Sequence, residues 1–399
     1  MNLFMILVLC SILIYVLWSK HYYPYSQIIS HGNPDIRIST GEKDGNYYKY
    51  SKLITDEYSK KKGTYMGYPY AYKTQGTLDN IKQVNEKNSD LGIVQEDILL
   101  KVIKSHENIR FISALYFETV HFMMHHYNDF ENKVSTLEDL KLSSKEVPYV
   151  IGTGLENSGH HINFLMVAKS FGLKPIKITE ETLGNVPETS SKNEIMYVCL
   201  PFKKAQEYFL QDVLDGMCFT MNTEDDRIIS LTQEYTSRNQ FELVFLSIPY
   251  NNEILNHISK NHYYKTNIDT SVYYEEFSKH KFIPSISTRA VLISHKDFDE
   301  TIAYIIAFTV YQNNSRFYKQ LFKRQNTGVH MSKDECSYTK EELPFHKGAY
   351  KYYKDIEQIQ LKSIHTNTRN PNTYAKRVVQ QYWKYPTIGQ QEFSLVSQD

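Results

Sequence analysis

Residues 36–50 read IRISTGEKDGNYYKY, and residues 68–80 read YPYAYKTQGTLDN. Each stretch begins with a short run that predicts a strand, passes through a glycine-bearing turn, and ends in a segment with helical spacing. A turn of this kind aims the unpaired N–H groups and partial positive charge of a helix N-terminus at one point. A third copy runs from Gly152-Thr153-Gly154 to Ser158-Gly159. If these turns face a common crevice, they form a site for a small anion, most simply a carboxylate.

Short apolar runs alternate with amphipathic segments along most of the 399 residues. Strands separated by helices predict βαβ units and mainly parallel sheets. We expect strands at 36–40, 68–73, 91–95, 109–116, 120–125, 149–152, 176–179, 195–200, 217–221, 243–248 and 289–294, and helices at 47–61, 77–87, 98–105, 158–171, 203–214, 226–237 and 298–313. The series restarts after a crossover, which predicts an α/β protein with two lobes. Lobe 1 is expected at 36–122, lobe 2 at 123–250, and a return to lobe 1 with closing helices at 251–356, followed by a C-terminal extension at 357–399.

The N-terminus carries an apolar run from Leu3 to Trp18. Its length of about 16 residues, or roughly 24 Å, suits either a signal-peptide core or a short membrane anchor. Trp18-Ser19-Lys20 is bulky and charged where a cleavage site would need small residues. We therefore expect an uncleaved anchor or signal segment at 1–20 and a linker at 21–35, with the remainder extracytoplasmic.

Bulk composition excludes several classes of function. Lysine plus arginine equals aspartate plus glutamate, 45 each, so no strong field favours nucleic acid. The four cysteines show neither metal spacing nor a disulfide framework. His160 and His161 are adjacent on an expected helix and point apart, so no metal is expected there. We expect no cofactor.

The candidate ligand-binding residues lie in the turns and at the strand ends that follow them. Thr77 is expected either to bind the ligand or to be the N-cap of its helix, a position that favours threonine, and both roles are compatible. Gln95 is a better candidate than Asp97, which suits a helix start. Glu118 is expected to anchor the hinge, while Tyr116 is expected to reach the ligand. The full set is Thr40, Gly41, Tyr47, Thr74, Gln75, Gly76, Thr77, Asn80, Gln95, Tyr116, Ser158 and Gly159.

Catalytic and nucleotide-binding alternatives fit poorly. The spacing from Gly152-x-Gly154 to Gly159 differs from that of a dinucleotide fingerprint, and no phosphate-loop lysine motif occurs. Glu156 stands where a nucleophile elbow would need glycine. The sequence contains no matched acid/base pair, nucleophile or metal cluster, so an enzyme is not expected.

The order of these motifs resembles the TAXI solute-receptor family, the extracytoplasmic binding proteins of TRAP transporters. The matching text is Ile38-Ser39-Thr40-Gly41 with Gly45 and Tyr47-Tyr48, then Thr74-x-Gly76-Thr77-x-x-Asn80, Asp90-Leu91-Gly92-Ile93-Val94-Gln95-x-Asp97, Leu115-Tyr116-x-Glu118-x-x-His121, Ser158-Gly159, Leu214-Asp215-Gly216 with Phe219, and Leu343-Pro344-Phe345-His346-Lys347-Gly348-Ala349-x-x-Tyr352-Tyr353. Asn46 and Gln75 depart from the family's usual residues.

The resemblance implies a two-lobed periplasmic-binding fold that closes on a small organic acid such as glutamate and delivers it to a membrane permease. Partners would be the carboxylate ligand, the permease subunits of a TRAP-type transporter and, through the N-terminal helix, the membrane. The alternative is a membrane-tethered sensory or interaction protein on the same fold with no transport partner.

Overall fold

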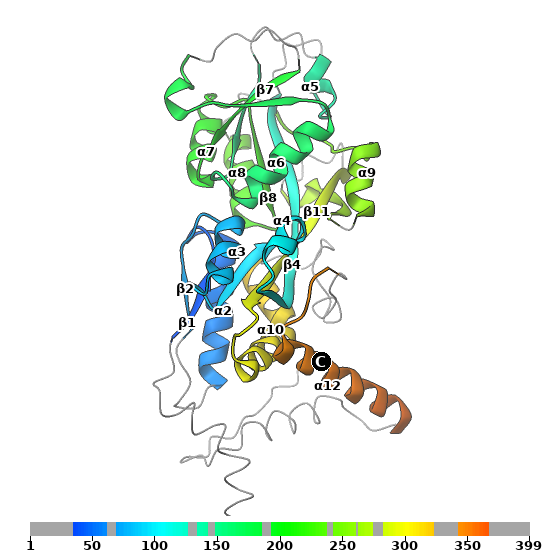
Figure 1. Ribbon diagram of the computed structural model, residues 1–399. Helices are drawn as coiled ribbons and strands as arrows, with labels where there is room; N and C mark the ends of the chain where they lie inside the picture. Colours follow the sequence, from blue (N-terminus) through cyan, green and yellow to red (C-terminus); the bar gives the residue numbers. More distant parts are fainter. Residues whose placement is uncertain are drawn as a thin grey trace, which may run out of the picture.

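The structure is a computed structural model that describes residues 35–61, 69–126, 134–142, 148–185, 193–237, 242–260, 262–273, 282–322 and 342–366. Two lobes lie one above the other in Figure 1, and the long strands β4 (Ile109–His126) and β11 (Phe282–His295) run between them. The expected membrane segment 1–20, nearly all of the linker and the tail from residue 367 lie outside the described residues. Of the helices that are described, none is both long and apolar enough to cross a membrane.

Lobe 1, the lower lobe in Figure 1, alternates strands and helices as the sequence predicts. Strand β1 pairs in parallel with β2 and β3. The elements are β1 (Ile36–Ser39), α2 (Asn46–Lys61), β2 (Pro69–Tyr72), α3 (Thr77–Asn85), β3 (Leu91–Gln95), α4 (Glu96–Val102), the 3-10 turn η1 (Ile103–Ser105) and, later in the chain, α10 (Glu300–Leu321) and α12 (Lys347–Thr366). The Asp299 carboxylate caps α10 by accepting a 2.8 Å hydrogen bond from the N–H of Ile302.

Lobe 2, the upper lobe, repeats the pattern. Strand β5 pairs in parallel with β7 and β8, and β6 pairs in parallel with β7. The elements are α5 (Asp139–Leu142), β5 (Val150–Thr153), α6 (Gly159–Ser170), β6 (Lys174–Lys177), η2 (Glu180–Thr182), β7 (Glu194–Cys199), α7 (Phe202–Leu210), β8 (Gly216–Met221), α8 (Asp226–Ser237), β9 (Glu242–Phe245), α9 (Asn252–Ser259), β10 (Tyr264–Asp269) and η3 (Thr270–Val272).

The two lobes share one sheet instead of having a sheet each. Among the described residues it has 11 strands, ordered β2-β1-β3-β11-β4-β8-β5-β7-β6, with β10 beside β11 and β9 beside β4. Strands β4 and β11 are antiparallel to all of their strand partners. The expected α/β class is confirmed, but the expected mainly parallel sheets are corrected to a mixed sheet that continues through both lobes.

The long strands differ from the elements expected in the sequence. Polar Glu118 and Thr119 interrupt the apolar run, which predicts separate strands at 109–116 and 120–125, yet β4 is continuous through them. Strand β11 begins at Phe282 rather than 289, and its partner β10 is not expected from the sequence. Both missed segments mix polar and apolar residues. Hydrogen bonding to a neighbouring strand holds them in the sheet, and they do not bury a fully apolar face, so the sequence lacks the pattern of a buried strand there.

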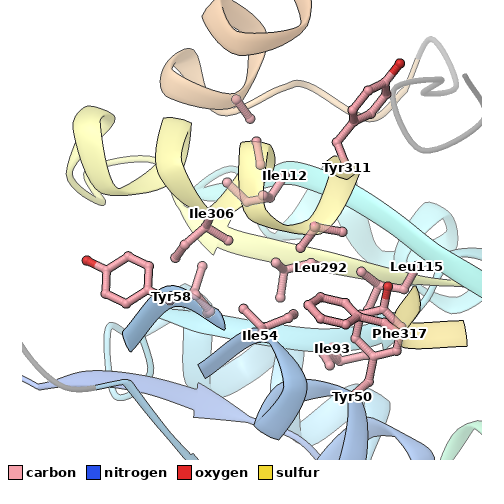
Figure 2. Close-up of a cluster of buried hydrophobic side chains, with 14 of the residues drawn as sticks. Tyr50, Ile54, Tyr58, Ile93, Ile112, Leu115, Leu292, Ile306, Tyr311 and Phe317 are labelled. Atoms are coloured by element: carbon pink, nitrogen blue, oxygen red, sulfur yellow. The ribbon is translucent and has the colours of Figure 1, made fainter. Parts of the chain in front are cut away.

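Helices α2, α10 and α12 cover one face of the lobe 1 sheet. Figure 2 shows Tyr50, Ile54 and Tyr58 of α2 pointing toward the strands and α10. The rings of Tyr50 and Phe317 meet edge to face with centroids 5.5 Å apart. Fully burying an aliphatic or aromatic side chain stabilises a fold by about 1.5–3 kcal/mol, so this cluster fixes α2 and hence the turn before it.

The chain returns to lobe 1 along β11. Ile254 and Ile286 belong to the same hydrophobic cluster as Phe164 of α6, and Ile268 belongs to the same cluster as Met217 of β8. Leu292, further along β11, belongs to the lobe 1 cluster. Packing therefore favours a later return than residue 250, and the lobe boundaries expected from the sequence stay a prediction.

Candidate functional site

The turns singled out in the sequence meet where the lobes touch. Gly76, just before α3, has φ +112°, and a Cβ placed on it would stand 3.4 Å from Cα and Cβ of Ser158 in lobe 2. A Cβ on Gly159 would stand 2.7 Å from Nε2 of Gln95 in lobe 1 and nearer still to its Oε1. The positive φ favours glycine at position 76, and the close approach of Gln95 requires it at position 159. The turns before α3 and α6 thus face each other across the interface.

Some candidate residues hold the turns together internally. Thr40 Oγ1 donates to the carbonyl of Tyr72 at 2.8 Å, and Thr74 Oγ1 donates to Asn80 Oδ1 at 2.6 Å. The Asn80 amide donates to the carbonyls of Ile93, at 2.7 Å, and Thr40. Asn80 is fully buried and these bonds use its side-chain amide. Thr40, Thr74 and Asn80 therefore support the turns from within the protein.

A second group forms a polar cluster at the interface. Gln95 N–H donates to Thr77 Oγ1 at 3.2 Å, and the Gln95 amide donates to Glu118 Oε2 at 3.3 Å. The hydroxyl of Tyr47, in the first turn of α2, donates to the same Oε2 at 2.8 Å. Tyr47 and Gln95 thus converge on the Glu118 carboxyl group, and Thr77 contacts the backbone of Gln95. The expected role of the three residues in ligand binding stays a prediction.

The polar cluster continues into lobe 2. Asn163 of α6 donates to Gln95 Oε1 and to Thr220 Oγ1, each at 3.1 Å. The Tyr263 hydroxyl lies 2.8 Å from Asn163 Oδ1 and 2.7 Å from Asp97 Oδ2. Burial raises the pKa of Asp97. These bonds bring α6 and the Tyr263 segment against Gln95 and Asp97 of lobe 1.

The remaining candidates differ in exposure. Ser158 caps α6, with its Oγ accepting from the N–H of His161 at 3.4 Å. Gln75 is exposed, and its N–H donates to Asp79 Oδ2 at 3.2 Å. A Cβ on Gly41 would meet nothing within 4 Å, so this turn borders open space.

Tyr116 is fully buried, and its hydroxyl has no hydrogen-bond partner among the residues that the structure describes. Burial, together with the charges of Glu118 and Asp225, raises its pKa well above the ordinary value. An unsatisfied buried hydroxyl costs about 1–3 kcal/mol, so a polar group from a ligand is a natural partner for it.

Sequence reasoning missed an arginine at the interface. Arg227, in the first turn of α8, holds Asp225 through Nε–Oδ1 (3.0 Å) and Nη2–Oδ2 (2.8 Å), while Asn46 of lobe 1 donates to Asp225 Oδ2 at 2.6 Å. Burial tends to raise the pKa of Asp225, but the charge and hydrogen bonds of Arg227 outweigh it and lower the pKa to about 2. The sequence pattern that could have indicated this pair is Asp225-x-Arg227 at the start of a helix, because an aspartate at that position caps the helix.

His160 is a second missed residue. Its Nδ1 accepts from the backbone N–H of Thr220 at 3.1 Å, which leaves the proton of the neutral ring on Nε2. Burial, aided by the charge of Arg227, lowers the pKa of His160 to about 4. The neutral ring is therefore a hydrogen-bond donor near physiological pH.

A cavity of about 680 Å³ opens beside the facing turns. Both lobes line it, from the turn before α3 in lobe 1 and from the carboxyl ends of β6 and β7 in lobe 2. Its walls include Lys73, Thr74, Gln75, Asp79, Leu155, Glu156, Lys177, Ile178, Thr179, Glu180, Val198 and Cys199. Cavities of roughly 300–1,000 Å³ suit small molecules. Within the described part of the chain, no cluster of three or more histidine, cysteine or acidic residues is arranged to hold a metal.

A comparison with known protein families identifies one family over most of the chain. A family model described as the NMT1-like family matches residues 38–357. The solved structure of XAC2383 from Xanthomonas citri bound to ATP has a TM-score of 0.49 at 8% identity, covering 81% of this chain and 99% of that one. A TctC solute binding protein from Polaromonas has a TM-score of 0.41 at 12% identity, covering 82% and 99%. By sequence, no curated protein matches. Likenesses at this level carry no information about a ligand.

Proposed function

The chain belongs to the NMT1-like family, and with that as the premise we propose that it is a solute-binding protein whose lobes close on a small carboxylate. The observation that carries the proposal is the cavity of about 680 Å³ lined by residues of both lobes. A site divided between two lobes encloses its ligand when they close, which removes water and strengthens each polar contact.

The charges around the cavity favour an anion. The first-turn N–H groups of α3 and α6 have no intrahelical acceptor and carry the positive end of each helix dipole. Lys73 and Lys177 stand on opposite lobes at the cavity wall. Lys177 already lies 2.7 Å from Glu156, so a ligand carboxylate would compete with an exposed ion pair of small strength.

Transport partners and location rest on the resemblance to TAXI receptors. We propose that the protein works outside the cytoplasm, tethered by its N-terminal segment, and passes its ligand to a TRAP-type permease. Co-purification of such a permease with the full-length chain would support this assignment over a sensory or interaction role, whereas a tethered protein that binds acid and never associates with a permease would contradict it.

A thermal-shift assay on the full-length chain tests ligand capture. Succinate, 2-oxoglutarate and L-glutamate should be compared with the matched neutral amides, and we expect an acid, but not its amide, to raise the melting temperature. Lys177→Gln, in the cavity wall, should weaken that rise. Lys174→Gln, exposed on the same strand β6, is the matched control. If no acid shifts the melting temperature, the proposed function is wrong.

A further inference from the structure

Glu118 differs from two other buried acids near the interface, Glu96 and Asp225. Glu96 pairs with the buried guanidinium of Arg289, at 2.9 Å from Nε to Oε2, and Asp225 pairs with Arg227. Glu118 is only 4% exposed, yet its partners among the described residues, Tyr47 and Gln95, are both neutral donors. An ionised carboxylate that is buried without a cation is strongly disfavoured.

Charged groups on two elements, α8 and α4, act on Glu118. Arg227 of α8 is the nearby cation, and it is already held by Asp225. Asp97 at the start of α4 adds a negative charge on the other side. Burial, as the dominant cause, raises the pKa of Glu118 to about 8 against the opposing hydrogen bonds and the charge of Arg227.

Glu118 is not among the residues that line the cavity described above; it lies at the interface beside Tyr47 and Gln95. Both hydrogen bonds of this carboxyl group reach Oε2, and Oε1 has no partner within the described chain. Tyr116, two residues earlier on β4, is the neighbour whose hydroxyl is fully buried and unpartnered. Thr77 and Gly159, at the N-termini of α3 and α6, contact the same Gln95 side chain or backbone. Two helix N-termini beside the group repel an ammonium and attract an anion.

We infer that Glu118 is a neutral carboxylic acid in the ligand-free protein and donates its proton in a hydrogen bond to the carboxylate of the captured ligand, an inference that rests on the proposed function. Two carboxyl groups that share one buried site hold one proton between them, because two adjacent negative charges repel. A protonated Glu118 thereby selects a ligand carboxylate, whereas an ionised Glu118 repels it.

The first test needs no ligand. A group whose folded pKa lies above its unfolded value stabilises the fold at low pH and loses that contribution as pH rises toward the folded value. Between about pH 5 and about pH 8, the unfolding equilibrium of the wild type should therefore shift toward unfolding by up to about tenfold per pH unit relative to Glu118→Gln. Glu107→Gln, an exposed control, should follow the wild type. Coincident pH profiles for wild type and Glu118→Gln would overturn the inference.

The second test fixes the sign of the proton linkage. The Kd is measured for the acid that gives the largest thermal shift. It should be constant from about pH 6 to about pH 8 and then rise about tenfold per pH unit. Calorimetry at about pH 9 in two buffers of different ionisation enthalpy should show uptake of nearly one proton per ligand. In Glu118→Gln, whose amide keeps a donor, the rise in Kd should vanish.

The outcomes separate the two proposals. Tighter binding as pH rises through about 8, with proton release, would show that Glu118 is the counter-ion of a cationic group and would overturn the inference while leaving solute capture in place. Binding that does not depend on pH would also overturn the inference and leave solute capture in place. Failure of every acid to bind counts against the proposed function, and the ligand-free titration still decides whether Glu118 holds a proton.

Discussion

Gly159 of α6 and the side chain of Gln95 on β3 are in direct contact across the interface between the lobes. The Gln95 amide is held there by Asn163 in lobe 2 and by Glu118 on β4. This contact depends on the absence of a side chain at position 159.

Gly159→Ala should therefore separate the lobes. Its methyl group would displace the Gln95 amide from Asn163 and Glu118, and overpacking of this kind costs about 1–3 kcal/mol. We expect a larger radius of gyration in solution scattering and loss of the acid-induced rise in melting temperature. Gly184→Ala is the control, because its Cβ would meet no atom within 4 Å. A Gly159→Ala variant that stays compact and binds normally would contradict this account of the contact.

Asn46→Asp should open the same interface by charge. Asn46 Nδ2 lies 2.6 Å from Asp225 Oδ2, so a carboxylate at position 46 would face another that stays ionised down to about pH 2. The expected result is a more open molecule with weaker acid binding, measured by scattering and thermal shift. Asn185→Asp, on an exposed turn, should change neither. Equal scattering profiles for the two variants would argue against an Asn46–Asp225 latch.

Arg227→Gln should lower stability at neutral pH by about 3–5 kcal/mol, because it leaves the buried Asp225 without its cation. The folded pKa of Asp225, about 2, lies below the ordinary value. Its contribution is thus present above about pH 4 and is lost as pH falls toward about 2. Urea unfolding should show that acid-dependent loss in the wild type but not in Arg227→Gln. Arg37→Gln breaks a more exposed pair with Asp90 and should cost under about 1 kcal/mol.

Tyr116→Phe should leave the ligand-free protein as stable as the wild type or raise its stability by about 1 kcal/mol, since the lost hydroxyl has no partner within the described chain. It should also reduce the acid-induced rise in melting temperature if the ligand uses that hydroxyl. Tyr263→Phe removes bonds to Asp97 and Asn163, and should destabilise the protein without ligand. A Tyr116→Phe variant that unfolds as easily as Tyr263→Phe would show that the hydroxyl already serves the fold.

The sequence predicted elements whose stabilising pattern is local. Helix α3 follows a turn with Gly76 and carries its apolar residues at helical spacing, and β3 begins with the apolar run from Leu91 to Val94. Strand β10 and the first half of β11, which pair with each other from Tyr264–Ser287 to Asp269–Phe282, were missed because they mix polar and apolar residues.

The site shows the same division. Tyr47, Thr77 and Gln95 belong to turns and strand ends that the sequence pattern predicts directly. Gly76 and Gly159 could be singled out because they have no side chain. The roles of Asn46, Asp225 and Arg227 depend on how the lobes meet, which no local pattern encodes. Thr77→Val would strip the buried N–H of Gln95 of its acceptor, so its effect would extend beyond the ligand to the fold.

Strands β4 and β11 belong to both lobes, and the chain crosses outward along one and back along the other (Figure 1). Neither half is consequently a module that recombination could transfer to another protein. A gene fragment encoding one half would end inside a shared strand and leave an unpaired sheet edge exposed. We expect relatives of this chain to have diversified by substitutions in the turns, with the two halves inherited together.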